Sequence, residues 1–476
     1  MSDYSSTINK IQSLFSDIAS AIRYRKEVSY DIAPSEFAFE VYGIENGADE
    51  EKTITNLLTG NLNYITIPSE ITSELKIGVF NNYSSLKYAN LNNVTIIPSS
   101  AFYSCITLAS IDGIKATNVG SYAFYSCRSL LSAYMPECSI IEQFAFNYCS
   151  LLKSIYLPSC AVIKQEAFCR DSELESAMLP NCSQIDSYAF GYCTKLSSIN
   201  IINCEIVDAG VFYSCIGLQG SINLPNCTKV SNSAFYNCNK ITSVSLPICT
   251  DIGPDAFYGC SGLTSINLPV CSSIGQYGFG ACTNIESVSA PLCTWIGKNA
   301  INCNKVHYLE LPELLTIAGS AFYNTTGLSS ISAPKVTAIY GYAFYGCTGL
   351  SEINFQKCNR ISGYFNFGGC TNVKVAYLPA CGSISQYTFQ GCTQLESVYF
   401  FSTNLVSIRI TQASHDIFAN TPIRDSSYLG HFGSIYVPES LVTNYQTATY
   451  WSTYYKDRIV GLTDEEIAII KAQYEN

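Results

Sequence analysis

A block of residues recurs along this chain every 22 positions, and this repeat constrains the fold more than any other feature. The block reads A-F-x-x-C, followed by L-x-S-I-x-L-P-x-C. Such a short period is typical of a solenoid, in which each coil packs only on its neighbours. The sequence therefore predicts about sixteen coils in one elongated domain. Their register positions are Phe80, Phe102, Phe124, Phe146, Phe168, Phe190, Phe212, Phe235, Phe257, Phe279, Ile301, Phe322, Phe344, Phe367, Phe389 and Phe418.

The composition fits a long neutral structure. Apolar residues make up 47% of the chain and charged residues only 13%, which is enough apolar material for a continuous core. The net charge of −11 disfavours phosphate backbones and anionic lipid, so we expect no nucleic-acid partner. No stretch reaches the roughly 18 apolar residues of a membrane span, so we expect no membrane insertion. The first residues, MSDYSSTINKIQSLF, lack the pattern of an export signal, and we expect folding in a reducing cytosol.

Each coil carries a short strand. In the segment LTSINLP, which begins at Leu263, Ile266 and Leu268 alternate with polar residues, and a proline ends the strand. Stacked coils pair such strands into a parallel ladder on one face. The opposite half of each coil carries an apolar residue five positions before the phenylalanine. The pattern leaves its conformation open between a short helical turn and an extended segment.

The pattern I-x-x-x-A-F-x-x-C-x-x-L-x-S-I-x-L-P resembles the BspA-like (Treponema-type) leucine-rich repeat family over residues 58–425. The resemblance implies an α/β solenoid, a right-handed leucine-rich-repeat superhelix with a parallel β ladder on one face. It also implies adhesion and recognition rather than one particular ligand. We predict a helical N-terminal module at 1–56, the solenoid at 57–425 and a helical C-terminal cap at 426–476.

The 23 cysteines follow the repeat. Twelve follow the phenylalanine position by about three residues, ten occupy the L-P-x-C slot, and Cys169 lies outside both groups. No C-x-x-C pair exists, which argues against a zinc site. Disulfides between neighbouring coils stay possible on distance grounds. Because other coils place Val94, Ala116, Leu314 or Thr325 in the same slots, we favour reduced thiols packed as small apolar side chains.

Catalytic patterns are scarce. The three histidines, His307, His415 and His431, show no spacing to a nucleophile and a carboxylate, and the chain has no phosphate-binding loop, zinc-protease motif or acidic calcium loop. We therefore predict a non-enzymatic protein with no catalytic residue, bound metal or cofactor. An enzyme acting on surface polysaccharide is the least favoured alternative.

The outward side of the strand ladder is the candidate binding surface. One column is mostly serine, and the next is rich in asparagine and tyrosine. Hydroxyls, amides and tyrosines suit a host surface glycan or protein. The competing interpretation is that small serines relieve crowding on a curved sheet, while asparagine and tyrosine are tolerated there. The candidate ligand-binding residues are Tyr134, Tyr156, Met178, Asn200, Asn223, Asn267, Tyr308, Asn354, Tyr377 and Tyr399.

The N-terminal segment predicts an amphipathic attachment helix, with Ile11, Leu14, Phe15, Ile18 and Ile22 on one face. This face packs either on the first coil or on a partner chain, and we favour the partner chain. The segment IQSLFSDIASAIRYRKEVSYDIAPSEFAFEVYGI resembles a short helical module of tail and baseplate-associated proteins of bacteriophages. The resemblance implies attachment to other virion or tail proteins and a virion location. A bacterial cell-surface adhesin is the alternative.

The C-terminal segment predicts a cap on the solenoid. Residues 434–438 form a last strand, and ESLVTNYQTATYWSTYYKDRI forms an amphipathic capping helix that resembles the end of the same repeat family. Thr463 and Glu466 form a capping-box pattern that begins a final helix. Its apolar residues Ile467, Ile470 and Ala472 are expected to dock on the cap or on a neighbour.

Overall fold

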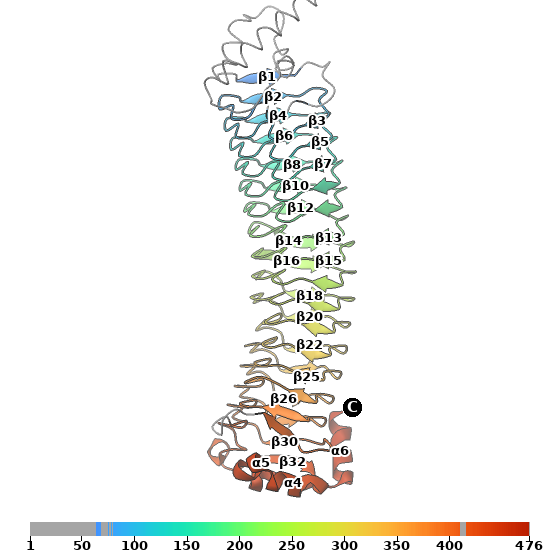
Figure 1. Ribbon diagram of the computed structural model, residues 1–476, viewed down its shortest axis with the longest axis vertical. Coiled ribbons are helices and arrows are strands. Elements are labelled where there is room, and N and C mark those ends of the chain that lie inside the picture. Colours follow the sequence, from blue (N-terminus) through green and yellow to red (C-terminus); the bar gives the residue numbers. More distant parts are fainter. Residues whose placement is uncertain (1–62, 68–74, 76–77, 79, 410–415, 476) are drawn as a thin grey trace, which may run out of the picture. The chain divides into compact units, whose positions relative to one another are not determined.

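The computed structural model describes residues 63–67, 75, 78, 80–409 and 416–475, and it divides into two compact units (Figure 1). Unit 1 is Met1–Cys204 with Val211–Leu218, and unit 2 is Glu205–Gly210 with Gln219–Asn476. The predicted attachment helix, with Ile11, Leu14, Phe15, Ile18 and Ile22, lies outside the described residues.

In unit 1, every coil contributes one three-residue strand to a seven-stranded parallel sheet, because each strand of the repeat pairs with the same positions 22 or 24 residues away. We call its outward side the sheet face. The middle residue is buried in five of these strands, as the alternation predicts, while Ala133 of β6 and Ile199 of β12 are half-buried. The strands are β1 (Tyr64–Thr66), β2 (Tyr88–Asn90), β4 (Ser110–Asp112), β6 (Ser132–Tyr134), β8 (Ser154–Tyr156), β10 (Ser176–Met178) and β12 (Ser198–Asn200).

The opposite half of each coil in unit 1 is extended, which settles the alternative that the sequence left open. Two-residue strands form a second parallel ladder there, and the apolar residue five positions before each phenylalanine is buried in it. These strands are β3 (Ile96–Ile97), β5 (Asn118–Val119), β7 (Ile140–Ile141), β9 (Val162–Ile163) and β11 (Gln184–Ile185).

Unit 2 repeats this arrangement, with its sheet face divided into shorter sheets of two, four and five strands. Those strands are β14 (Gln219–Asn223), β16 (Lys240–Ser245), β18 (Ser265–Asn267), β20 (Ser287–Ser289), β22 (Tyr308–Glu310), β24 (Ser330–Ser332), β26 (Glu352–Asn354), β28 (Val375–Tyr377), β30 (Ser397–Tyr399), β32 (Ser434–Pro438) and β33 (Ile459–Leu462). Its second ladder contains β13 (Ile206–Val207), β15 (Lys229–Val230), β17 (Asp251–Ile252), β19 (Ser273–Ile274), β21 (Trp295–Ile296), β23 (Thr316–Ile317), β25 (Ala338–Ile339), β27 (Arg360–Ile361), β29 (Ser383–Ser385) and β31 (Ser407–Arg409). The predicted parallel solenoid with a 22-residue period is confirmed.

Phenylalanine rings form the centre of each core. In unit 1, Phe102 and Phe124 stack with ring centroids 5.2 Å apart, and Phe124 stacks on Phe146 at 4.9 Å. In unit 2, Phe235, Phe257 and Phe279 repeat the same stack. Burying one such ring contributes about 1.5–3 kcal/mol. In the coils that carry a phenylalanine, one ring per coil therefore packs on the ring of a neighbouring coil, while Ile301 takes this position in one coil.

The cysteines line the interior as free thiols, and all 23 are buried. The thiols that follow the phenylalanine donate to the carbonyl oxygen of the phenylalanine in the preceding coil: the Cys105 Sγ lies 3.0 Å from the Phe80 oxygen and the Cys260 Sγ 3.0 Å from the Phe235 oxygen. The thiols in the L-P-x-C slot donate to the backbone carbonyl oxygen two residues later in the chain. The Cys271 Sγ, for example, lies 3.1 Å from the Ser273 oxygen. The predicted interior position of both cysteine slots is confirmed.

We expect the 23 thiols to be slow to react in the folded protein. Burial raises the pKa of Cys105 to about 12 and that of Cys160 to about 11, which leaves little thiolate at neutral pH. A thiol-reactive dye should label few sites in buffer and about 23 per chain in guanidinium. Fewer than half of the thiols reacting in guanidinium without reductant would contradict the reduced ladder.

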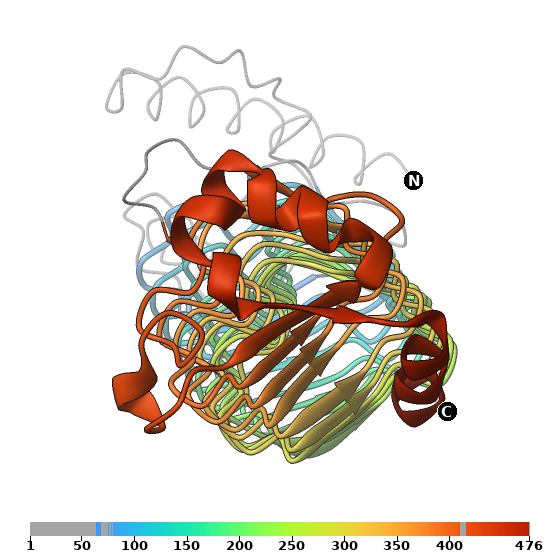
Figure 2. The same cartoon turned by 90° about the horizontal axis from the view of Figure 1, so that it is seen from below.

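Helices cover the last coils of unit 2 (Figure 2). The prediction of a single capping helix is wrong. Ala448 has an extended backbone (φ −68°, ψ 132°) and separates α4 from α5. Trp451 is buried and donates from its Nε1 to the Val406 oxygen at 3.1 Å, so the segment seals the core as predicted. The helices are η1 (Ser426–Tyr428), η2 (Glu439–Leu441), α4 (Val442–Thr447), α5 (Thr449–Tyr454), η3 (Lys456–Arg458) and α6 (Asp464–Tyr474).

Candidate functional site

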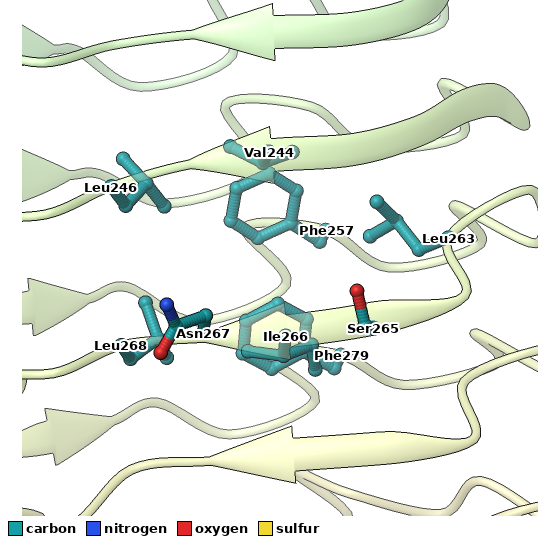
Figure 3. A pocket seen from close by; sticks show the side chains of 9 residues that line it. All are labelled: Val244, Leu246, Phe257, Leu263, Ser265, Ile266, Asn267, Leu268 and Phe279. Carbon is teal, nitrogen blue, oxygen red and sulfur yellow. The ribbon is translucent and has the colours of Figure 1, made fainter.

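The interior of the coils offers little space for a ligand at the position drawn in Figure 3. Nine residues line this space in unit 2, including Phe257 and Phe279, whose stacked rings lie 5.2 Å apart. The space admits about one water molecule and is lined mainly by apolar side chains. It is a packing gap between coils, so candidate binding residues have to be sought on the surface.

Unit 1 brings three of the predicted residues into one exposed strip. Strand register places Tyr134 directly beside Tyr156, and Tyr156 beside Met178. Their exposed fractions are 50%, 52% and 48%, which are high for large side chains within a sheet. Asn200 follows in the same column and is half-buried. We call Tyr134, Tyr156 and Met178 the open strip.

In the first coils of unit 2, the sheet face is exposed but polar. Asn223 and Asn267 are exposed at the ends of their strands. Tyr308 is 51% exposed, and the residue beside it on the neighbouring strand β24 is Ser330. Tyr308 is therefore a single large side chain on a surface of small ones, unlike the paired tyrosines of unit 1.

Three predicted residues do not lie on an open surface, which corrects the sequence-based expectation. Tyr377 is fully buried, Tyr399 is half-buried and Asn354 donates to the chain's own backbone, because helix α6 lies on this part of the sheet face. In Figure 1, α6 runs along the direction in which the last coils stack. This end of the face is already occupied.

Helix α6 is held by apolar packing and by hydrogen bonds. Ile467 packs with Tyr377 and Phe401, and the Tyr474 ring stacks on the Tyr377 ring at 4.7 Å. The Tyr377 hydroxyl donates to Glu475 Oε1 at 2.6 Å, while Asn354 Nδ2 donates to the Tyr474 oxygen at 2.9 Å. Burial and the nearby carboxylate raise the pKa of Tyr377, so it stays a hydrogen-bond donor. The face thus binds a helix through tyrosine rings and amide groups.

The start of α6 is as predicted, since Thr463 and Glu466 form the capping box: the Thr463 amide donates to Glu466 Oε2 at 2.8 Å. This hydrogen bond lowers the pKa of Glu466. Of the three apolar residues expected to dock on the cap or on a neighbour, Ile467 and Ile470 dock instead on the sheet face, and Ala472 is exposed. The spacing of Ile467, Ile470 and Tyr474, at i, i+3 and i+7, was the signal for an apolar stripe.

The sequence reading missed an exposed apolar group in unit 2. Its five side chains are between 37% and 50% exposed and lie on consecutive coils. Ile248, Val270 and Leu292 occupy the x position of the L-P-x-C slot in three successive coils. Apolar residues repeated at this position could have predicted the exposed group from the sequence. The group consists of Ile248, Val270, Leu292, Trp295 and Leu315.

The described residues offer little reactive chemistry. The His307 ring contacts the Gly327 oxygen at 3.1 Å, and His431 is exposed, while His415 lies outside the described residues. Within the described ranges, no three histidine, cysteine or carboxylate side chains gather as a metal site. In the same part of the chain, none of the helices has the length and apolar character required to span a membrane.

Known proteins share this fold. The chain is similar, at 24% identity and a TM-score of 0.58, to a leucine-rich repeat protein from Bacteroides ovatus ATCC 8483, over 68% of this chain and 92% of that one. It is also similar, at 21% identity and a TM-score of 0.35, to a leucine rich cell surface protein from Faecalibacterium prausnitzii A2-165, over 76% of this chain and 92% of that one. None of the curated proteins compared with the sequence matches it.

The repeat itself matches a known family. The family model described as BspA type leucine rich repeat region (6 copies) matches residues 56–130, 117–242, 228–336 and 315–437. These segments cover most of the chain and follow the same 22-residue register as the stacked coils. The chain belongs to the BspA-type leucine-rich repeat family.

Proposed function

We propose that this chain is a non-enzymatic recognition scaffold and that the open strip of unit 1 binds a protein partner. One observation carries the proposal: the chain's own helix α6 occupies the equivalent strand positions in unit 2. Tyr377 and Tyr399 there stand in the same column of the repeat as Tyr134 and Tyr156 of unit 1. A surface that binds a helix at one place supports helix or peptide binding where the same side chains stand exposed.

The chemistry of the open strip favours a protein ligand. Tyrosine combines a rigid apolar ring with a hydroxyl and loses little entropy on binding. Met178 adds a flexible apolar side chain that adapts to different shapes. Ser132 and Ser154 lie in the neighbouring column and leave room for a bound segment. Together they suit the apolar stripe of an amphipathic helix, whose polar side remains in water.

Replacing both tyrosines of the open strip with serine should weaken peptide binding at least tenfold, about 1.4 kcal/mol. The probe is a peptide selected against the full chain from a displayed library of random 20-residue sequences. Fluorescence anisotropy gives its Kd for the wild type and for Tyr134→Ser/Tyr156→Ser. Both side chains are about half exposed, so the thermal midpoint should stay within 1–2 °C.

Tyr308→Ser is the matched control, since this tyrosine has the same exposure but lies among serines in unit 2. It should leave the Kd unchanged. Equal binding by the wild type and the double variant, or failure of the library to yield any binder, would contradict the proposal.

For the biological setting, we propose a phage virion, with the solenoid displayed for host-cell recognition. The support is the N-terminal segment, which resembles modules of tail and baseplate-associated proteins and lies outside the family match that begins at residue 56. That segment would attach the scaffold to other virion proteins. Mass spectrometry of purified virions should detect the protein. Its detection only in the surface fraction of uninfected cells would instead support a bacterial adhesin.

A further inference from the structure

A second surface of unit 1, away from the sheet face, carries a strained cluster of large side chains. Each coil has a turn residue two positions after the phenylalanine, and its φ is positive wherever the phenylalanine register holds. Most coils fill this position with serine, asparagine, glycine or alanine, which tolerate the left-handed region better than bulky residues. Three consecutive coils instead carry Tyr148, Arg170 and Tyr192, with φ of 64°, 67° and 62°.

These three residues form one sandwich. The Arg170 guanidinium carbon lies 5.2 Å from the centre of the Tyr148 ring and 5.0 Å from the centre of the Tyr192 ring. Backbone hydrogen bonds hold neighbouring coils in register. The Arg170 amide, for example, donates to the Gly191 oxygen at 2.8 Å. The guanidinium carbon of Arg170 thus lies over both aromatic rings.

The in-plane N–H groups of Arg170 are available to a ligand. Arg170 is exposed, and none of the ion pairs among the residues that the structure describes includes it. The Arg170 side chain forms a hydrogen bond with the buried thiol of Cys169. Glu166, on the same turn, accepts from Asn147 Nδ2 at 3.3 Å, and the carboxylate of the adjacent Asp171 is buried. A guanidinium has the fork of N–H groups that forms two parallel hydrogen bonds to a carboxylate.

We propose that Tyr148, Arg170 and Tyr192 form a binding site for a carboxylated sugar of an acidic glycan. A sugar of this kind carries a carboxylate for Arg170, hydroxyls for the tyrosine hydroxyl groups and apolar C–H groups for the partly exposed tyrosine side chains. A polyanion such as nucleic acid would need several cations along its backbone, whereas the cluster of Tyr148, Arg170 and Tyr192 contains one. The site is separate from the open strip and does not depend on the function proposed above.

The experiment measures binding of the full chain to a panel of oligosaccharides that contain glucuronic, galacturonic or sialic acid, each paired with its methyl ester. We expect at least one acid to bind with a Kd below 1 mM and its neutral ester to bind at least tenfold more weakly. Arg170→Met should cause the same tenfold loss. Arg128→Met is the matched control, because Arg128 is exposed two coils away and its Nε donates to Ser126 Oγ at 3.1 Å, and it should bind as the wild type does.

A second variant separates a binding site from a merely structural stack. Tyr192→Asn places asparagine where Asn237 and Asn324 already occupy the same turn position, so it should keep or raise the thermal midpoint while binding falls at least fivefold. A lower midpoint with unchanged binding would show that the sandwich only stabilises the coils. The absence of any acid-selective binding, or binding of an acidic peptide but of none of the sugars, would also overturn the assignment.

Discussion

Replacing Asp171 with cysteine should raise the free energy of unfolding by about 1–3 kcal/mol at pH 7. Asp171 occupies the slot that follows the phenylalanine, where Cys149 and Cys193 stand in the adjacent coils. Its side chain is fully buried. Oδ1 accepts from the Cys149 amide at 2.8 Å, but Oδ2 has no hydrogen-bond partner among the described residues. A thiol at this position could donate to the phenylalanine carbonyl oxygen of the preceding coil, as Cys149 and Cys193 do.

The gain should depend on pH in a defined direction. Burial raises the pKa of Asp171 well above its ordinary value. Well below the ordinary aspartate pKa of about 3.9, the carboxyl group is neutral in both the folded and the unfolded chain, so its penalty is small. As the pH rises, the unfolded chain releases the proton first, and the stability of the wild type falls until the folded-state pKa is reached. The advantage of Asp171→Cys should therefore grow between pH 4 and pH 7.

Denaturant unfolding at both pH values checks this expectation. Thr325→Cys is the control, because Thr325 fills the same slot in unit 2 and its hydroxyl already donates to the Ile301 oxygen at 3.1 Å. This substitution should change stability by less than about 1 kcal/mol at either pH. An equal advantage of Asp171→Cys at pH 4 and pH 7 would argue against a buried protonated acid.

Ile467→Asp should detach helix α6 from unit 2 and cost about 2–4 kcal/mol. Ile467 is 8% exposed and packs with Tyr377 and Phe401, so a carboxylate there would have to be buried without a partner or leave the face with the helix. Release of α6 would also free Asn354, which donates to the Tyr474 oxygen. The last strands of the sheet face would then be open.

Limited proteolysis and thermal unfolding measure this release. The wild type should resist cleavage within 464–474, and the variant should be cut there rapidly. Ile469→Asp is the matched control: Ile469 lies two residues away on the same helix and is 67% exposed, so its substitution should leave cleavage and midpoint unchanged. Similar protection of both variants would mean that Ile467 does not hold the helix.

Much of the fold follows from the repeat because coil length, strand position and core residues all obey one period. The phenylalanine stack and the cysteine slots were predictable since each coil must bury the same positions against the next. The second ladder was not predictable in the same way, because a two-residue strand such as Val162–Ile163 is too short to show a periodicity of its own. The break at Ala448 likewise depends on packing around Trp451.

The candidate surface was only partly predictable. Alternation places Tyr134 and Tyr377 on the same side of their strands, and the sequence cannot distinguish them. Their environments differ because α6, which begins at Asp464, folds back over Tyr377 and not over Tyr134. The sandwich around Arg170 was missed for a similar reason, since turn residues carry no hydrophobic pattern and their positive φ appears only in the structure.

Hydroxyl-radical footprinting tests the recognition surface most directly, because tyrosine and methionine are oxidised readily when exposed. The full chain is oxidised with and without the library-selected peptide, and mass spectrometry gives the extent of modification at each residue. Tyr134, Tyr156 and Met178 should be protected by the peptide, while Tyr308 should be oxidised as before. Protection at Tyr308 or elsewhere, with the three residues of the open strip unchanged, would contradict binding at the sheet face of unit 1.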